Sequence, residues 1–132
     1  MGDYNDPSLT TSNDISTEFT NDYSTKGNKS LKATPQGTGG YTGYVANTTD
    51  YSGKTIKLTV DTKTDNTNWK LQILYYYSSW SSSNSVDIST GETSPSIQMQ
   101  IPAEATRVWF RMQHNGSSGD IIFTDNWCLE EV

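Results

Sequence analysis

The sequence predicts an all-β fold, an antiparallel β-sandwich, and three observations support this prediction. Short segments that alternate apolar and polar side chains recur through the 132 residues, separated by stretches rich in Ser, Thr, Asn and Gly. No segment shows the periodicity of an amphipathic helix. Only 32% of the residues are hydrophobic and 18% are charged, and the abundant Ser, Thr, Asn and Gly are poor helix formers. About nine short strands in one domain are expected, and their uneven loops favour a two-sheet jelly roll over a closed barrel.

The strands are expected where apolar side chains recur at every second position. Residues 1–14 contain little to bury, so we expect an N-terminal arm or an edge strand ahead of a sandwich that spans residues 15–132. The serine-rich residues 78–85 are expected to form a flexible loop. The expected strands are 15–19, 31–33, 41–46, 55–62, 69–77, 86–88, 97–101, 107–113 and 121–129.

Alternation is clearest in residues 55–62, where Ile56, Leu58 and Val60 share one face. Residues 97–101 alternate in the same way and stop at Pro102. Proline has no N–H to give to a ladder, so it ends this strand.

The strand expected at residues 107–113 is the most informative one, because both of its faces are distinctive. Its inward side chains would be Val108, Phe110 and Met112. Its outward side chains would be Arg107, Trp109, Arg111 and Gln113. Guanidinium and amide groups around an indole suit a polar ligand with apolar faces, and a sugar is such a ligand. Alternatively, the guanidinium groups stack on the ring and cover it with nothing bound.

A second strand repeats this chemistry. In residues 69–77 the outward set contains a cation, an amide and an aromatic ring, and Trp80 follows in the serine tract. An exposed Trp80 would need a ligand or packing against the sheet. Tyr41 or Tyr44 would extend the aromatic platform, and Gly43 leaves their facing open. The candidate ligand-binding residues are therefore Trp109, Arg107, Arg111, Gln113, Gln72, Tyr76, Lys70, Trp80, Tyr41 and Tyr44.

The last expected strand contains an acid in an unusual setting. Strict alternation places Asp125 on the same face as Phe123, Trp127 and Leu129. A carboxylate on an apolar face is unfavourable unless it is paired or coordinated. Asp125 is therefore expected either to accept hydrogen bonds from backbone amides or to bind a metal ion.

Five segments, taken in order and with their spacing, resemble a known family: residues 27–34, 52–58, 101–103, 107–112 and 123–129. Together they are similar to the carbohydrate-binding modules of the family 4/9/22 type, galactose-binding-like β-jelly rolls that are appended to glycoside hydrolases and surface proteins. The resemblance covers roughly residues 15–132.

The resemblance implies that one concave sheet binds a glycan chain through aromatic rings and polar side chains. The strands at 41–46, 69–77 and 107–113 would belong to that sheet. Members of this family also commonly hold a structural calcium ion. The resemblance implies a site built from Asp125, from Asn28 and Lys29 through their carbonyl groups, and from Asp6 in place of the acid that the family has in its first strand.

Charge and composition restrict the partners. The net charge of −6 and the pI near 4.5 argue against nucleic acid and anionic membranes, which require a positive field. No apolar run approaches the ~20 residues of a membrane helix. The single Cys128 cannot form an intramolecular disulfide.

The expected function is non-catalytic binding of a polysaccharide or oligosaccharide. We expect an extracellular or cell-surface location, as a monomeric part of a larger multidomain protein. The alternative is a structural or protein-binding module of a cell-surface or phage-like protein. An enzyme ranks third, because the acids lie mainly in turns and at the termini, and His114 is expected to be solvated in a polar turn.

Overall fold

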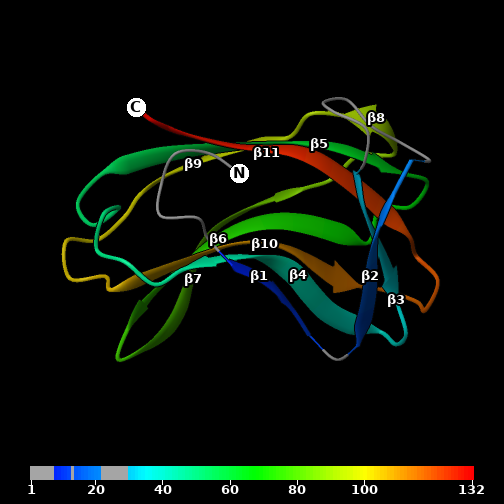
Figure 1. Ribbon diagram of the computed structural model, residues 1–132, viewed down its shortest axis with the longest axis horizontal. Helices are drawn as coiled ribbons and strands as arrows, with labels where there is room; N and C mark the ends of the chain where they lie inside the picture. Colours follow the sequence, from blue (N-terminus) through cyan, green and yellow to red (C-terminus); the bar gives the residue numbers. More distant parts are fainter. Residues whose placement is uncertain (1–7, 13, 22–29) are drawn as a thin grey trace.

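The computed structural model describes residues 8–12, 14–21 and 30–132. Regular structure within these ranges consists of strands, which form two antiparallel sheets packed face to face (Figure 1). The five-stranded sheet has the order β1-β4-β10-β6-β7, and the six-stranded sheet has the order β2-β3-β11-β5-β8 with β9 also on β5. The predicted sandwich of the jelly-roll kind is confirmed. Within the ranges described, no helix is long and apolar enough to cross a membrane.

The strands closely follow the alternation in the sequence. Their bounds are β1 Ser8–Thr11, β2 Ile15–Thr20, β3 Ser30–Pro35, β4 Gly39–Ala46, β5 Thr55–Thr64, β6 Trp69–Tyr77, β7 Ser79–Asp87, β8 Gly91–Thr93, β9 Ser96–Gln100, β10 Arg107–Asn115 and β11 Ile122–Glu131. β8 and β9 follow one another along the same edge of β5. Within the N-terminal residues expected to be an arm or an edge strand, β1 lies at the edge of the five-stranded sheet.

The prediction of a serine-rich loop is wrong. Residues 79–87 form β7, which pairs with β6 from one end to the other, with one register shift between Ile73 and Leu74. A tight turn at Ser78, with φ of 59°, reverses the chain, and the main-chain hydrogen bonds of the β6–β7 ladder do not depend on side-chain type. The short strand β8 was not predicted either.

The core lies between the two sheets and is formed by the side chains that point inward at every second position of each strand. Val108, Phe110 and Met112 of β10 are buried, as predicted, and face the aliphatic side chains of β5 across the sandwich. Trp69 and Tyr51 are the largest side chains that are fully buried. Truncation of a core aromatic such as Phe110 typically lowers stability by about 3–5 kcal/mol.

A β-bulge in β11 overturns the predicted face of the last strand. The register with β5 shifts between Asp125 and Cys128, and Asn126 adopts a left-handed conformation with φ of 51°. The extra residue moves Trp127 onto the inward face with Thr124, whose hydroxyl accepts the indole N–H at 3.1 Å. Asp125 therefore lies on the outer side, away from the core.

Candidate functional site

The predicted ligand-binding side chains gather on the outer side of the five-stranded sheet. β10 lies between β4 and β6, and Figure 1 shows this sheet arching toward its partner, with its outer side in the hollow of the arch. Cross-strand pairs place Arg111 opposite Gln72 and Arg107 opposite Tyr76. We call this set the aromatic–arginine face: Tyr41, Lys70, Gln72, Tyr76, Trp80, Arg107, Trp109, Arg111 and Gln113.

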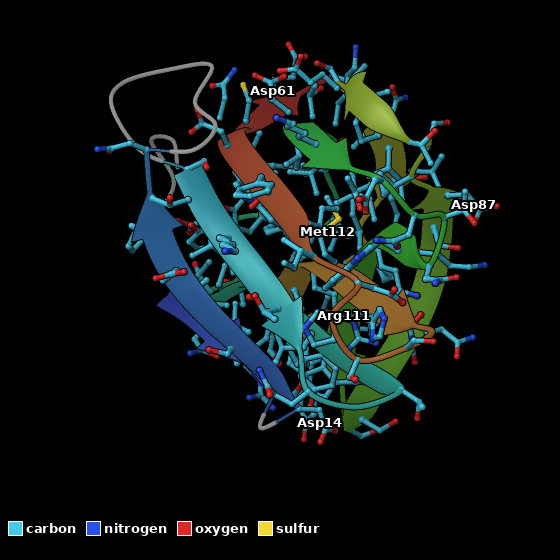
Figure 2. All side chains as sticks on the ribbon, turned by 90° about the vertical axis from the view of Figure 1, so that its right-hand side faces the viewer. Asp14, Asp61, Asp87, Arg111 and Met112 are labelled. Atoms are coloured by element: carbon cyan, nitrogen blue, oxygen red, sulfur yellow. The ribbon has the colours of Figure 1, made fainter. Side chains whose placement is uncertain are left out.

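Alternation along β10 separates this face from the core. In Figure 2, Asp61 lies at the top of the view on the six-stranded sheet, Arg111 lies toward the bottom, and Met112 lies between them. Arg111 is half-buried and Met112 is fully buried. The face predicted from period two is therefore present.

Arg107 is held by two rings at one end of the face. Its guanidinium carbon lies 3.9 Å from the centroid of Tyr76 and 5.0 Å from that of Trp80. Those two rings meet edge to face at 5.3 Å. Tyr76 and Trp80 remain partly exposed, so the turn between β6 and β7 presents aromatic surface to solvent.

Arg111 is held in the same way further along the face. Its guanidinium carbon lies 4.6 Å from the centroid of Tyr41 and 4.7 Å from that of Trp109. Trp109 in turn lies 4.6 Å from Tyr41 and 5.4 Å from Trp80. The two arginine clusters are thus joined through the Trp80–Trp109 contact. The mutual covering of rings and guanidinium groups, the alternative that the sequence left open, is present at Trp109, which is only 7% exposed.

Amide groups fix the orientation of Arg111. Arg111 Nε donates to Gln72 Oε1 at 2.9 Å, and Gln72 Nε2 donates to Gln113 Oε1 at 2.9 Å. Gln72 is buried, so this chain of hydrogen bonds is held firmly. Burial lowers the pKa of Arg111 below its ordinary value, an effect partly opposed by Tyr41.

Gly43 makes room for this arrangement. It lies opposite Arg111 in the β4–β10 ladder. A Cβ at this position would collide with the Phe110 carbonyl oxygen and would lie 2.8 Å from the Arg111 Cβ. A side chain at position 43 would force the two strands apart.

Tyr44 is not part of the face, and its inclusion among the candidates is wrong. It pairs with Phe110 on the inward side, and its ring packs edge to face on Trp127 at 5.2 Å. Burial, and secondarily the charge of Asp125, raise the pKa of Tyr44. Tyr41 and Tyr44 are three residues apart, so alternation allows only one of them to face outward.

The sequence analysis missed two members of the outer side, Val45 and Asp87, whereas alternation along residues 69–77 places Leu74 there correctly. Val45 and Leu74 flank Trp109 on β4 and β6, and Leu74 is buried although it points outward. Asp87 of β7 pairs with Lys70 at 3.4 Å at the rim. Strand pairing identifies these neighbours, and the pairing of β7 was not predicted.

Asp125, the predicted metal ligand, lies on the other sheet. It is opposite Asp61 of β5, and its Oδ1 accepts the backbone N–H of Asn126 at 2.8 Å. Asn126 Nδ2 also donates to Asp61 Oδ2 at 3.3 Å. These carboxylate oxygens are of the type that calcium prefers.

The rest of the predicted calcium site is not described. Asn28, Lys29 and Asp6 lie outside the described residues. In the part of the chain that is described, no group of three or more His, Cys, Asp or Glu side chains could hold a metal ion.

Known proteins share this architecture. No protein-family model matches the sequence, and no curated protein matches it. Among solved structures, the C-terminal family 22 carbohydrate-binding module of Clostridium thermocellum Xyn10B is similar, with a TM-score of 0.73, 12% identity, and coverage of 93% of this chain and 84% of that chain. The fold is that of carbohydrate-binding modules. The predicted resemblance to the family 4/9/22 type is confirmed at the level of the fold.

Two further structures show the range of this carbohydrate-binding-module fold. A CBM4 module has a TM-score of 0.64 at 15% identity, with coverage of 88% of this chain and 78% of that chain. The enzymatically active domain of bacteriophage CBA120 tailspike protein 4 has a TM-score of 0.68 at 15% identity. The match covers 95% of this chain but only 19% of the tailspike chain.

His114, the only histidine, is buried, so the expectation that it is solvated is wrong. Its Nε2 lies 3.0 Å from Asp120 Oδ2. That oxygen also accepts the Ser117 backbone N–H at 2.7 Å and Asn68 Nδ2 at 2.8 Å. The bond to His114, followed by that from Ser117, lowers the pKa of Asp120. This arrangement ties the β10–β11 turn to the core.

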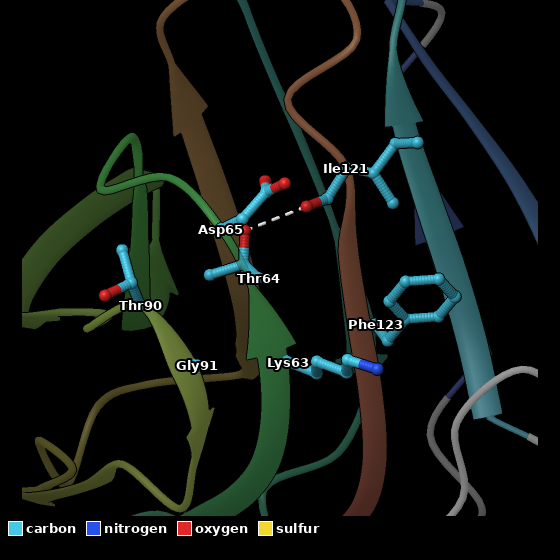
Figure 3. Close-up of a pocket in the computed structure, with 7 residues that line it drawn as sticks. All are labelled: Lys63, Thr64, Asp65, Thr90, Gly91, Ile121 and Phe123. Carbon is cyan, nitrogen blue, oxygen red and sulfur yellow. Dashed lines mark hydrogen bonds between the residues drawn. The ribbon is translucent and has the colours of Figure 1, made fainter.

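A cavity of about 460 Å³ lies beside β5, β8 and β11, away from the aromatic–arginine face (Figure 3). Phe123 and Lys63 line it, together with Thr90 and Ile121. The Thr64 hydroxyl donates to the Ile121 carbonyl oxygen at 2.8 Å beside it. None of the predicted site residues lines this cavity.

Proposed function

We propose that this chain is a non-catalytic carbohydrate-binding module that binds a polysaccharide chain along the aromatic–arginine face. The observation that carries the proposal is the continuous contact of four rings and two guanidinium groups on the outer side of one sheet, from Tyr41 through Trp109 to Tyr76. The shared fold supports it, because one similar structure is a xylan-binding domain and another was solved with β-1,4-galactotriose.

In the proposed binding mode, aromatic rings and hydrogen-bonding groups make different contacts with the sugar. The partly exposed rings of Tyr76 and Trp80 stack on the apolar faces of sugar rings. Guanidinium N–H groups of Arg107 and Arg111, the ammonium group of Lys70 and the amide of Gln113 bond to hydroxyl groups. A ligand with the wrong hydroxyl pattern leaves these groups unpaired, and this penalty supplies specificity.

The remaining features of the proposal follow from this role. The chain acts outside the cell or at its surface as a monomeric part of a larger protein, and it contributes binding rather than catalysis. A glycosidase needs two carboxylates close together. Among the described residues on the outer side of the five-stranded sheet, Asp87 at the rim supplies a single carboxylate, which is paired with Lys70.

Affinity electrophoresis tests the proposal directly. The purified domain is run through gels that contain soluble β- and α-glucans, xylan, mannans or pectins. We expect retardation by at least one polysaccharide and its loss in Trp80→Ala. Phe19→Ala is the matched control, because Phe19 is an aromatic residue of β2, on the other sheet, and is 62% exposed. Equal mobility in every gel would contradict the proposal.

A protein-binding module is the second candidate. Tyr, Trp and Arg side chains in contact with one another are also typical of protein-interface hot spots, and this face contains all three. Failure to bind any polysaccharide, together with a partner whose affinity falls in Trp80→Ala, would favour this candidate.

We also propose a structural calcium ion near Asp125. Its carboxylate and that of Asp61 supply oxygen ligands on adjacent strands, and Asn28, Lys29 and Asp6 would complete the site. A ligand at 100 times its Kd stabilises the folded state by about 2.7 kcal/mol. We therefore expect a chelator to lower the Tm of the wild type and to leave the Tm of Asp125→Asn unchanged. A wild-type Tm that does not respond to calcium or chelator would exclude the ion.

A further inference from the structure

The two arginines differ from four of the lysines in their partners. Within the described ranges Lys32, Lys54, Lys57 and Lys70 each have a carboxylate oxygen within 4.0 Å. Arg107 and Arg111 have none among the described residues and instead contact rings and, for Arg111, an amide oxygen. A half-buried cation is favourable when an anion offsets its loss of solvent. Among the described residues, these guanidinium groups therefore lack the carboxylate partner that the four lysines have.

Trp109 presents a third unused donor on the same face. Its indole Nε1 is buried and has no hydrogen-bond partner among the described residues. An orphaned buried donor costs about 1–3 kcal/mol. The ring lies 4.7 Å from the Arg111 guanidinium, so this unpaired N–H belongs to a ring that packs against Arg111.

The side-chain amide oxygens and the carboxylate of this region already have donors or cations as partners. Gln72 Oε1 receives Arg111 and Gln113 Oε1 receives Gln72. The carboxylate of Asp87 at the rim is paired with Lys70. The aromatic–arginine face therefore offers donors and positive charge to a ligand, with its described side-chain acceptors largely satisfied internally.

We infer that the ligand of this face is an acidic glycan, whose carboxylate or sulfate groups bond to Arg107 and Arg111, rather than a neutral polysaccharide. This inference rests on the proposed function and specifies its substrate class. Guanidinium groups match the planar, two-oxygen edge of a carboxylate and donate to it in pairs. The rings beside them stack on the sugar that bears the acid.

The net negative charge of the protein restricts which anionic polymers can bind to the aromatic–arginine face. At a net charge of −6 the protein repels polyanions in general. Attraction must come from local contacts at the face, so an anionic polymer without sugar rings exposed for stacking, such as duplex DNA, should not bind. Binding to the acidic glycan should weaken with added salt but should not vanish, because the stacking contacts are not screened.

The experiment compares two polymers with the same backbone. Polygalacturonate and its carboxyl-reduced form are used in affinity gels and in calorimetric titrations, with dextran sulfate as the sulfate arm and duplex DNA as a polyanion control. We expect retardation by polygalacturonate or dextran sulfate, and affinity at least about tenfold lower for the reduced polymer. Arg107→Gln should weaken binding by about tenfold or more.

Matched variants separate charge at the face from charge elsewhere. Lys57→Gln removes one positive charge from the six-stranded sheet, where Lys57 pairs with Glu130 at 4.0 Å, and should leave binding unchanged. Arg111 lies between the rings of Tyr41 and Trp109. Arg111→Lys keeps the positive charge but removes the planar guanidinium that donates two hydrogen bonds to a carboxylate, so it tests that geometry. A several-fold loss is expected from this substitution as well.

The outcomes are distinguishable. Equal affinity for native and reduced polymers, binding of neutral polysaccharides alone, or equal binding of DNA would overturn the acidic-glycan inference and, in the first two cases, leave the proposed function standing. Binding to no polysaccharide at all would defeat the proposed function itself.

Discussion

Positively charged side chains on the outer sides of the two sheets have different kinds of partner. On the six-stranded sheet Lys32 lies 3.9 Å from Glu18, and Lys57 lies 4.0 Å from Glu130. On the five-stranded sheet Arg107 and Arg111 lie against aromatic rings. The first surface has its charges offset by neighbours, whereas the second retains unsatisfied donors.

This difference supports our proposal that the outer side of the five-stranded sheet binds a ligand. Exposed ion pairs contribute at most about 1 kcal/mol each and leave little for a ligand to gain. A half-buried guanidinium keeps part of its interaction energy available until a ligand supplies acceptors. Four predictions test this contrast, beginning with the largest expected effect.

Truncation of Trp109 should have the largest effect on stability. Trp109→Ala should lower the free energy of unfolding by about 3–5 kcal/mol, because the ring packs against Tyr41, Trp80 and the Arg111 guanidinium. Phe123→Ala on the other outer side should cost clearly less, since Phe123 is only partly buried. Urea denaturation measures both. A similar loss from the two variants would remove the contrast between the faces.

Gly43→Ala should disturb the face through the backbone. The added methyl group would collide with the Phe110 carbonyl oxygen, and such overpacking costs about 1–3 kcal/mol. Gly37→Ala is the control, because a Cβ there meets nothing within 4 Å. In thermal unfolding, Gly43→Ala should show a markedly lower Tm and Gly37→Ala should not. An unchanged Tm in Gly43→Ala would mean that β4 and β10 can separate at no cost in stability.

Acid should weaken the turn beside β10 rather than the face itself. The folded-state pKa of Asp120 is lowered from 3.8, so its contribution to stability is complete above pH 3.8 and is lost as the pH falls through the folded-state value. In urea titrations Asp120→Asn should be less stable than the wild type by about 1–3 kcal/mol near neutral pH. This gap should narrow below pH 3.8, and a gap that stays constant down to pH 2 would contradict the assignment.

Breaking an ion pair on the six-stranded sheet should have the smallest effect. Lys57→Gln should change the free energy of unfolding by less than about 1 kcal/mol, and high salt should reduce even this change. Arg107→Gln provides the comparison, because we expect stacking of Arg107 on Tyr76 and Trp80 to depend less on salt than an exposed ion pair does. A larger effect at Lys57 than at Arg107 would reverse the assignment of the two surfaces.

Period-two alternation predicted most of the sheets and one face of the site. It correctly separated Phe110 from Trp109, because a strand allows a side chain only two directions. It failed at Asn126, where a bulge breaks the period and places Trp127 on the inward face, opposite to Asp125 on the outer side. No local pattern signals that event.

Other features depend on partners that are distant in sequence. Serine-rich β7 forms because β6 offers a paired edge, and composition alone indicated a loop. The mutual covering of Trp109 and Arg111 requires Tyr41 from β4 and Trp80 from β7. The burial of His114 requires Asp120 six residues later. The sequence offered guanidinium–indole stacking as an alternative, but the contacts with partners from other strands were not predicted.

The Trp80–Trp109 contact has an optical consequence. Of the four tryptophans, Trp69 and Trp127 lie in the core, whereas Trp80 and Trp109 meet on the aromatic–arginine face at 5.4 Å and an interplanar angle of 58°. Two indoles so close and so inclined couple their electronic transitions and give an exciton couplet in circular dichroism. The molecule therefore carries an intrinsic chromophore pair at its candidate binding surface, whose signal changes whenever a ligand alters the angle between the two rings.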